Sequence, residues 1–117
     1  MPYLIALATS DRKTIHQHFG KTKTFAIFSV DNNGYAYLET RNVEPCCNNH
    51  THHENAFEQI FEILHDCQAI VAGKIGSGAA DYFMSKGIYV FETIGYIDDV
   101  LNEFSRNLSR YFPKNKK

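Results

Sequence analysis

The sequence has 117 residues, 44% of them hydrophobic, and its 12 basic and 13 acidic residues give a net charge of −1. This length suits one domain, which we assign to residues 1–112, followed by a short basic tail at 113–117. The balanced charge disfavours nucleic-acid binding, and we see neither a signal peptide nor a membrane span. Three cysteines are too few and too unevenly placed for a secreted disulfide framework, so we expect a cytoplasmic protein with reduced, buried or metal-bound thiols.

The first half of the chain predicts three strands. Residues 3–8 form a short apolar run, 24–30 are rich in aromatic and β-branched residues, and 35–40 alternate. The alternation predicts that Tyr35, Tyr37 and Glu39 share one face of the third strand. Residues 31–34 read Asp-Asn-Asn-Gly, and because Asn and Gly tolerate positive φ, we expect an antiparallel hairpin there.

The second half predicts alternating helices and strands. Apolar residues at helical spacing indicate a helix over 53–66, and 69–72 reads as a buried strand. A glycine-rich turn at 73–78 precedes a helix over 79–86, which Gly87 closes as a left-handed cap. A strand over 88–91 and a final helix with its apolar face from Ile97 to Leu108 complete the chain. This order implies parallel crossovers that join the hairpin strands in one mixed sheet.

Two segments resemble the dinitrogenase iron–molybdenum cofactor biosynthesis family. The first is Asp11 followed by residues 15–20, which end in His18-Phe19-Gly20, and the second comprises residues 66–73, 75–79 and 86–88. The resemblance implies an α/β, ribonuclease H-like fold with a mixed five-stranded sheet of order 3-2-1-4-5 flanked by helices. It also implies a role in carrying or delivering iron–sulfur or iron–molybdenum cofactor precursors.

That topology predicts where a site would form. The loops after the first, third, fourth and fifth strands would emerge at the same sheet edge, and these loops are residues 9–23, 41–52, 73–78 and 92–96. Open α/β sheets bind ligands at the carboxyl ends of their strands, beside the point where the strand order reverses.

Residues 46–54 contain an unusual density of possible metal ligands. Thiolate and imidazole groups bind zinc, copper and iron–sulfur centres, so we predict metal ligands among five residues: Cys46, Cys47, His50, His52 and His53. The spacing is not that of a zinc finger, and a polar loop that is merely rich in histidine is the alternative. Thr51 and Glu54 fit a capping box that would place His52 and His53 in the first turn of a helix.

A second group of predicted site residues lies on the family's motifs. The resemblance extends to His18 and Asp11, for which we predict cofactor binding, although a histidine hydrogen-bonded within its own loop is an equal alternative for His18. Gly76, Ser77 and Gly78 open a helix after a strand, so their N–H groups could meet an anion, while a tight chain reversal is the plainer explanation. Cys67 is expected to be a small core residue rather than a ligand.

We therefore expect a non-catalytic protein that binds an iron–sulfur cluster, an iron–molybdenum cofactor precursor or a single transition metal ion. Its expected partners are cofactor-assembly proteins. A regulatory or interaction module without metal is one alternative. A ribonuclease H-like nuclease is another, but the central strands at 3–8 and 69–72 carry none of the carboxylates that two-metal chemistry needs.

Overall fold

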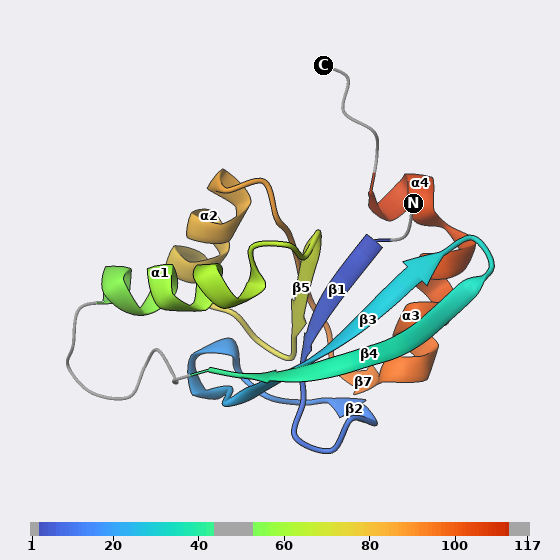
Figure 1. The fold of residues 1–117 in the computed structure, drawn as a ribbon, viewed down its shortest axis with the longest axis horizontal. Helices are drawn as coiled ribbons and strands as arrows, with labels where there is room; N and C mark the ends of the chain where they lie inside the picture. The colour runs from blue at the N-terminus through green and yellow to red at the C-terminus, as the bar shows by residue number, and fades with distance from the viewer. Residues whose placement is uncertain (1–2, 44–52, 113–117) are drawn as a thin grey trace.

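The computed structural model describes residues 3–43 and 53–112, and Figure 1 shows their fold. Five strands form one mixed sheet: β1 (Tyr3–Ala8), β3 (Thr24–Asp31), β4 (Gly34–Asn42), β5 (Ala69–Ala72) and β6 (Tyr89–Glu92). Their order is β4-β3-β1-β5-β6, in which β3 is antiparallel to β1 and β4, whereas β1, β5 and β6 are parallel. The order and strand directions predicted from the sequence are confirmed.

Helices cover both faces of this sheet (Figure 1). On one face lie α1 (His53–Leu64) and α2 (Ser77–Ser85), and on the other lie α3 (Ile97–Arg106) and α4 (Leu108–Tyr111). The predicted helices at 53–66 and 79–86 exist with slightly different ends. Gly87 has φ +87° and follows α2, which confirms the predicted left-handed cap. None of the helices in the described residues is long and apolar enough to cross a bilayer.

The two faces of β1 show why its sequence is continuously apolar. Ala6 and Ala8 pack in the core beneath α1 and α2, whereas Ile5 and Leu7 pack in the core against α3, and all four are fully buried. Because neighbouring strands flank β1 on both edges and helices cover both faces, residues 5–8 are shielded from water, whereas Tyr3 and Leu4 at its start are half-buried. The central strands are therefore buried structural elements that bring their following loops to one edge.

The β3–β4 hairpin forms as predicted, but its turn differs from the expected one. Asp31 pairs with Gly34, which leaves Asn32 and Asn33 as the two loop residues, and the Asp31 carboxylate accepts a hydrogen bond from the Asn33 N–H at 2.8 Å. Gly34 has φ +142°, while Arg12 is the only described non-glycine residue with positive φ. The glycine alone supplies the unusual backbone geometry here.

The prediction that Tyr35, Tyr37 and Glu39 share one face of β4 is wrong for Glu39. A β-bulge shifts the register, so that Tyr37 pairs with Phe28 but Glu39 pairs with Ile27, and Leu38 is the extra residue. Tyr37 consequently lies on the α3 face of the sheet, and Glu39 lies on the α1 face with Ile27. Simple alternation could not predict this because a bulge adds one residue without a compositional signal.

The bulge turns Arg41 toward the end of α1. Its guanidinium donates to both carboxylate oxygens of Asp66, at 2.7 and 3.1 Å, and to the Ile63 carbonyl at 2.8 Å. A further hydrogen bond of 2.7 Å reaches Glu39. The hydrogen bond from Arg41 lowers the pKa of Asp66, because it stabilises the carboxylate form. One side chain thus links the edge strand to the helix that precedes β5.

We expect Asp66→Asn to lower the free energy of unfolding at neutral pH by about 1 kcal/mol or less, since the carboxylate is partly exposed and solvent screens the pair. The folded-state pKa of Asp66 is depressed, so its contribution is complete above the unfolded-state pKa near 3.8 and disappears as pH falls through the folded-state value.

Urea denaturation of both proteins between neutral and acidic pH tests this expectation. The stability curves should converge at acidic pH, and Glu62→Gln, which changes an exposed carboxylate on α1, should show no comparable pattern. A gap between the wild type and Asp66→Asn that stays constant down to the lowest pH would contradict it.

Candidate functional site

The carboxyl ends of β1, β4, β5 and β6 lie at one edge of the sheet, as their common direction requires. Three described loops converge there: residues 9–23 after β1, 73–76 after β5 and 93–96 after β6. In Figure 1 this edge lies at the bottom, next to β2 (Thr14–Ile15) and β7 (Gly95–Tyr96), while the N-terminus and α4 lie at the opposite end. Three of the loops among which the sequence predicts a site therefore meet at this edge, and the site itself stays a prediction.

A small second sheet ties the first of these loops to the last. Thr14 pairs with Tyr96 and Ile15 pairs with Gly95 in an antiparallel ladder, which the Ile97 N–H extends by donating to the Lys13 carbonyl at 2.9 Å. The buried Ile15 side chain anchors this ladder in the core. This ladder could not be predicted from the sequence because two-residue strands leave almost no periodic pattern, and the β-branched pair Thr14-Ile15 is too short a signal by itself.

Asp11 organises the start of the β1 loop. Its Oδ1 accepts hydrogen bonds from the backbone N–H groups of Lys13 and Thr14, both at 2.9 Å, and from the Thr9 hydroxyl at 3.0 Å. These donors hold the pKa of Asp11 well below its usual range, because they stabilise the ionised carboxylate. The predicted cofactor role of Asp11 remains a prediction, and the geometry gives this carboxylate a turn-forming task.

The end of the same loop lies directly against the loop after β5. The Gly73 N–H donates to the Gln17 carbonyl at 2.9 Å, and the Phe19 N–H donates to the Lys74 carbonyl at 2.7 Å. Through these backbone hydrogen bonds His18 and Lys74 form an isolated parallel β-bridge. A Cβ on Gly73 would lie 3.1 Å from the His16 carbonyl carbon and 3.2 Å from the Gln17 oxygen. The close approach of two backbones therefore favours glycine here, because a Cβ would force one of them to move by a few tenths of an ångström.

These contacts fix the backbone of His18 and leave its side chain exposed. Phe19, the next residue, is 2% exposed and packs against the rings of Phe25 and Phe83. The Thr22 hydroxyl donates to the His18 carbonyl at 2.8 Å, whereas the imidazole forms no hydrogen bond with any described residue. The motif thus combines a buried aromatic anchor with an adjacent exposed histidine. The cofactor role that the sequence predicts for His18 stays a prediction.

The glycine-rich turn lies beside this segment and opens α2. Gly76 is the N-cap, and among the described residues no side chain caps the helix and a Cβ built on Gly76 or Gly78 would meet open space. The Glu92 carboxylate accepts the Ile75 N–H at 2.9 Å and so ties the turn to the end of β6. Exposed N–H groups at the start of a helix favour negative charge. Ser77 is also exposed, so the predicted set of Gly76, Ser77 and Gly78 forms an accessible rim.

Positive charge gathers on the same loops. Five exposed cations lie on or next to them: Arg12, Lys13, Lys21, Lys23 and Lys74. The two carboxylates among these segments, on Asp11 and Glu92, are both engaged by backbone N–H groups. This edge therefore favours an anionic ligand. Sequence analysis did not find the cluster because the cations are scattered along the chain and only the sheet topology assembles them.

Most of the predicted thiol and imidazole ligands lie outside the described residues. Cys46, Cys47, His50 and His52 belong to that group, and His53 opens α1 without a described side chain. The preceding chain is placed at the site edge, because the Val43 N–H donates to the Lys23 carbonyl at 2.8 Å. Among the described side chains, those of residues 3–43 and 57–112, no three His, Cys, Asp or Glu groups form a metal-binding cluster. The ligand set of this loop stays a prediction.

Cys67 lies elsewhere, at the amino end of β5. It is 3% exposed, as expected for a core residue, and burial raises the pKa of its thiol to about 12. A thiol held in its protonated form is a poor metal ligand. The prediction that Cys67 packs in the core is confirmed.

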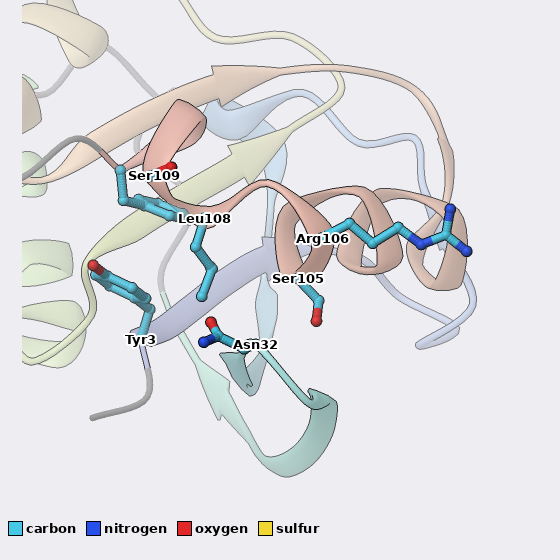
Figure 2. Close-up of a pocket in the computed structure, with 7 residues that line it drawn as sticks. Tyr3, Asn32, Ser105, Arg106, Leu108 and Ser109 are labelled. Carbon is cyan, nitrogen blue, oxygen red and sulfur yellow. The ribbon is translucent and has the colours of Figure 1, made fainter.

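A separate cavity of about 530 Å³ lies at the opposite end of the sheet, beside Tyr3, Asn32 and Leu108. Figure 2 shows that the Arg106 side chain points away from Tyr3 and Asn32, although its helix borders the cavity. The Ser105 hydroxyl donates a hydrogen bond to the Asp31 carbonyl at 2.6 Å. This cavity lacks the converging charged groups found at the carboxyl edge.

Comparison with known proteins agrees with this topology. A family model described as dinitrogenase iron-molybdenum cofactor matches residues 1–107. The chain belongs to this family. It is 31% identical over 85 residues, 73% of the chain, to the FeMo cofactor biosynthesis protein NifB of Herbaspirillum seropedicae, and 29% identical over 108 residues, 90% of the chain, to NifB of Frankia alni. The matches span only 16% and 21% of those two proteins.

Solved structures show the same fold. The crystal structure of PH0822 superposes with a TM-score of 0.66 at 23% identity, covering 87% of this chain and 88% of the other. The crystal structure of MJ0327 from Methanocaldococcus jannaschii gives a TM-score of 0.58 at 21% identity, covering 90% and 89%. The two solved structures therefore share the overall fold of this chain, a mixed five-stranded sheet with flanking helices.

We expect Gly73→Ala to lower the free energy of unfolding by about 1–3 kcal/mol, because the added methyl group meets two backbone atoms that cannot move independently. Gly78→Ala is the matched control. It introduces the same methyl group into open space within a helix, where alanine is the better helix former and should raise stability slightly. Chemical denaturation measures both, and equal effects of the two substitutions would contradict the close approach at Gly73.

Proposed function

We propose that this protein binds and carries a metal centre at the carboxyl edge of its sheet. The cargo is an iron–sulfur cluster or a precursor of the iron–molybdenum cofactor, with a single transition metal ion as the simpler form. Membership of the family and the similarity to NifB proteins support this assignment. The strand order and directions also support placing the sheet in the ribonuclease H-like class.

The observation that carries the proposal is the position of His18. Two backbone hydrogen bonds hold its segment against Gly73 and Lys74, in the turn that leads into α2, and the residue is exposed. A neutral imidazole is a common ligand of iron and other transition metals. A rigid backbone presents that ligand without a further loss of conformational entropy on binding.

The remaining groups of this edge have complementary tasks. The exposed cations and the N–H groups at the start of α2 stabilise the negative charge of a sulfide-rich cluster. The loop between β4 and α1 supplies the proposed thiolate and imidazole ligands from Cys46, Cys47, His50, His52 and His53. Protein ligands from separate loops at one edge suit a carrier, since a partner in cofactor assembly can approach the cargo from the open side.

The role we propose is non-catalytic. The central strands β1 and β5 contribute only apolar side chains, whereas two-metal hydrolysis needs carboxylates projecting from such strands. Asp11, the carboxylate nearest to the end of β1, is occupied by its own turn. These observations favour binding and transfer over hydrolysis.

Anaerobic reconstitution with iron and sulfide, followed by metal analysis and absorption spectroscopy, tests the proposal. We expect near-stoichiometric uptake by the wild type and loss of uptake when Cys46, Cys47, His50 and His53 are changed together to Ala. His18→Ala should weaken binding by about tenfold or more, because even removal of an outer-shell partner commonly costs that much.

His65→Ala provides the matched control for His18→Ala. His65 is also an exposed histidine, but it follows α1 at the opposite edge of the sheet, so its loss should leave uptake unchanged. Circular dichroism should show that all variants retain their secondary structure. Uptake that persists in the quadruple variant would contradict the ligand loop, and equal effects of His18→Ala and His65→Ala would contradict the role of His18.

A further inference from the structure

A groove lies along the free edge of the sheet, away from the histidine motif. It is a cavity of about 340 Å³ between the end of β6 and the helices α3 and α4. Its apolar walls come from Phe91, Val100, Phe104 and Tyr111, and two carboxylates, Asp99 and Glu103, stand on the α3 side. The groove therefore offers an apolar floor beside negative charge.

The strand next to this groove has an unpaired edge. β6 is the last strand of the sheet, and no strand lies beyond it among the described residues. The Tyr89 and Thr93 N–H groups donate inward to the carbonyls of Gln68 and Ala72, both at 2.9 Å. Because backbone groups alternate in direction along a strand, those of Val90 and Glu92 point outward. An extended chain could pair with them.

The charges on α3 define the chemistry of an occupant. Asp99 and Glu103 are exposed and lie four residues apart, so they share one side of the helix. Glu103 accepts the Tyr111 hydroxyl at 3.0 Å, and this hydrogen bond raises the pKa of Tyr111, which keeps the ring in place as a neutral wall. Lysine or arginine side chains suit this side of the groove.

We propose that this groove binds an extended segment of a partner protein, which adds to the sheet beside β6. An apolar side chain of the segment fills the space between Phe91 and Val100, and a lysine or arginine two positions away meets Asp99 and Glu103. Edge strands that border a helix bind peptides in this way, with backbone hydrogen bonds for affinity and a side-chain pocket for specificity.

The chain's own tail is a less suitable occupant. Residues 113–117 read Pro-Lys-Asn-Lys-Lys, so they supply positive charge but no apolar side chain for the floor of the groove. A partner segment combines both features. The tail could nevertheless compete for the groove, and an experiment on a chain without it can distinguish the two occupants.

The probe is the heptapeptide Thr-Lys-Thr-Val-Thr-Lys-Thr, blocked at both ends, whose valine and lysines share one face of a strand. Titration into the isotopically labelled full chain, followed by amide NMR, should shift the signals of residues 89–93 and 99–103. Replacing both lysines with glutamate should abolish binding. Two further peptides carry N-methyl groups on one or the other set of alternate backbone amides. Only one of these sets faces β6, so methylation of that set should abolish binding and methylation of the other set should not.

Variants of α3 test the charged side of the groove. We expect the Asp99→Asn, Glu103→Gln double variant to weaken peptide binding by about fivefold, as two partly exposed charge pairs are lost. Asp98→Asn is the matched control, because this carboxylate belongs to the same helical turn but accepts the Tyr35 hydroxyl of β4 at 3.1 Å. It should leave the affinity unchanged.

Several results would overturn the proposal. These are no binding at millimolar peptide, equal binding of the lysine and glutamate peptides, equal binding of the two N-methylated peptides, and signal shifts outside the groove. A chain truncated after Phe112 should bind the peptide as the full chain does. Binding that appears only after this truncation would make the tail the occupant and contradict the partner segment.

Discussion

The close approach of two loop backbones at Gly73 is the contact on which the arrangement of the carboxyl edge depends. Strands β1 and β5 are neighbours at the point where the strand order reverses, and the loops that follow them leave the sheet together. Because Gly73 has no Cβ, the segment around Gln17 can pair with it directly. That pairing sets Phe19 into the core and fixes the backbone of its neighbour, His18. The position of the exposed imidazole is therefore a consequence of backbone geometry and core packing.

Much of the fold could be predicted because its signals are local. The apolar runs of β1 and β5, the Asp-Asn-Asn-Gly turn and the helical spacing of apolar residues each need only a few neighbouring residues to be recognised. The strand order came from the family resemblance. The bulge at Leu38 and the β2–β7 ladder were missed because both depend on pairing between distant segments. The same is true of the link from Arg41 to Asp66, which forms only after the bulge has turned Arg41 over.

The site was only partly accessible to sequence reasoning. His18 was found through its motif, and its exposure adds a physical reason for its candidacy. The basic character of the edge was not found, since Arg12, Lys23 and Lys74 are remote in sequence and converge only in the fold. Asp11 shows a different difficulty. It lies on the family motif and has the chemistry of a ligand, but its carboxylate accepts hydrogen bonds from the backbone of its own turn. The residues from Cys46 to His52 lie outside the described chain, so their assignment still rests on residue chemistry.

The bulge in β4 also governs how this edge strand can change in length. Before Leu38, odd-numbered side chains such as Tyr35 face α3, and after it the odd-numbered Glu39 and Arg41 face α1. Loss of Leu38 would make Tyr37 and Glu39 adjacent, which restores a regular ladder and leaves both side chains on the faces that they occupy now. A single deletion elsewhere in the strand that kept the bulge in place would instead shift one part of it by one residue and exchange the faces of its side chains. The bulge is therefore the position at which this edge strand can lose one residue without exchanging its inner and outer surfaces.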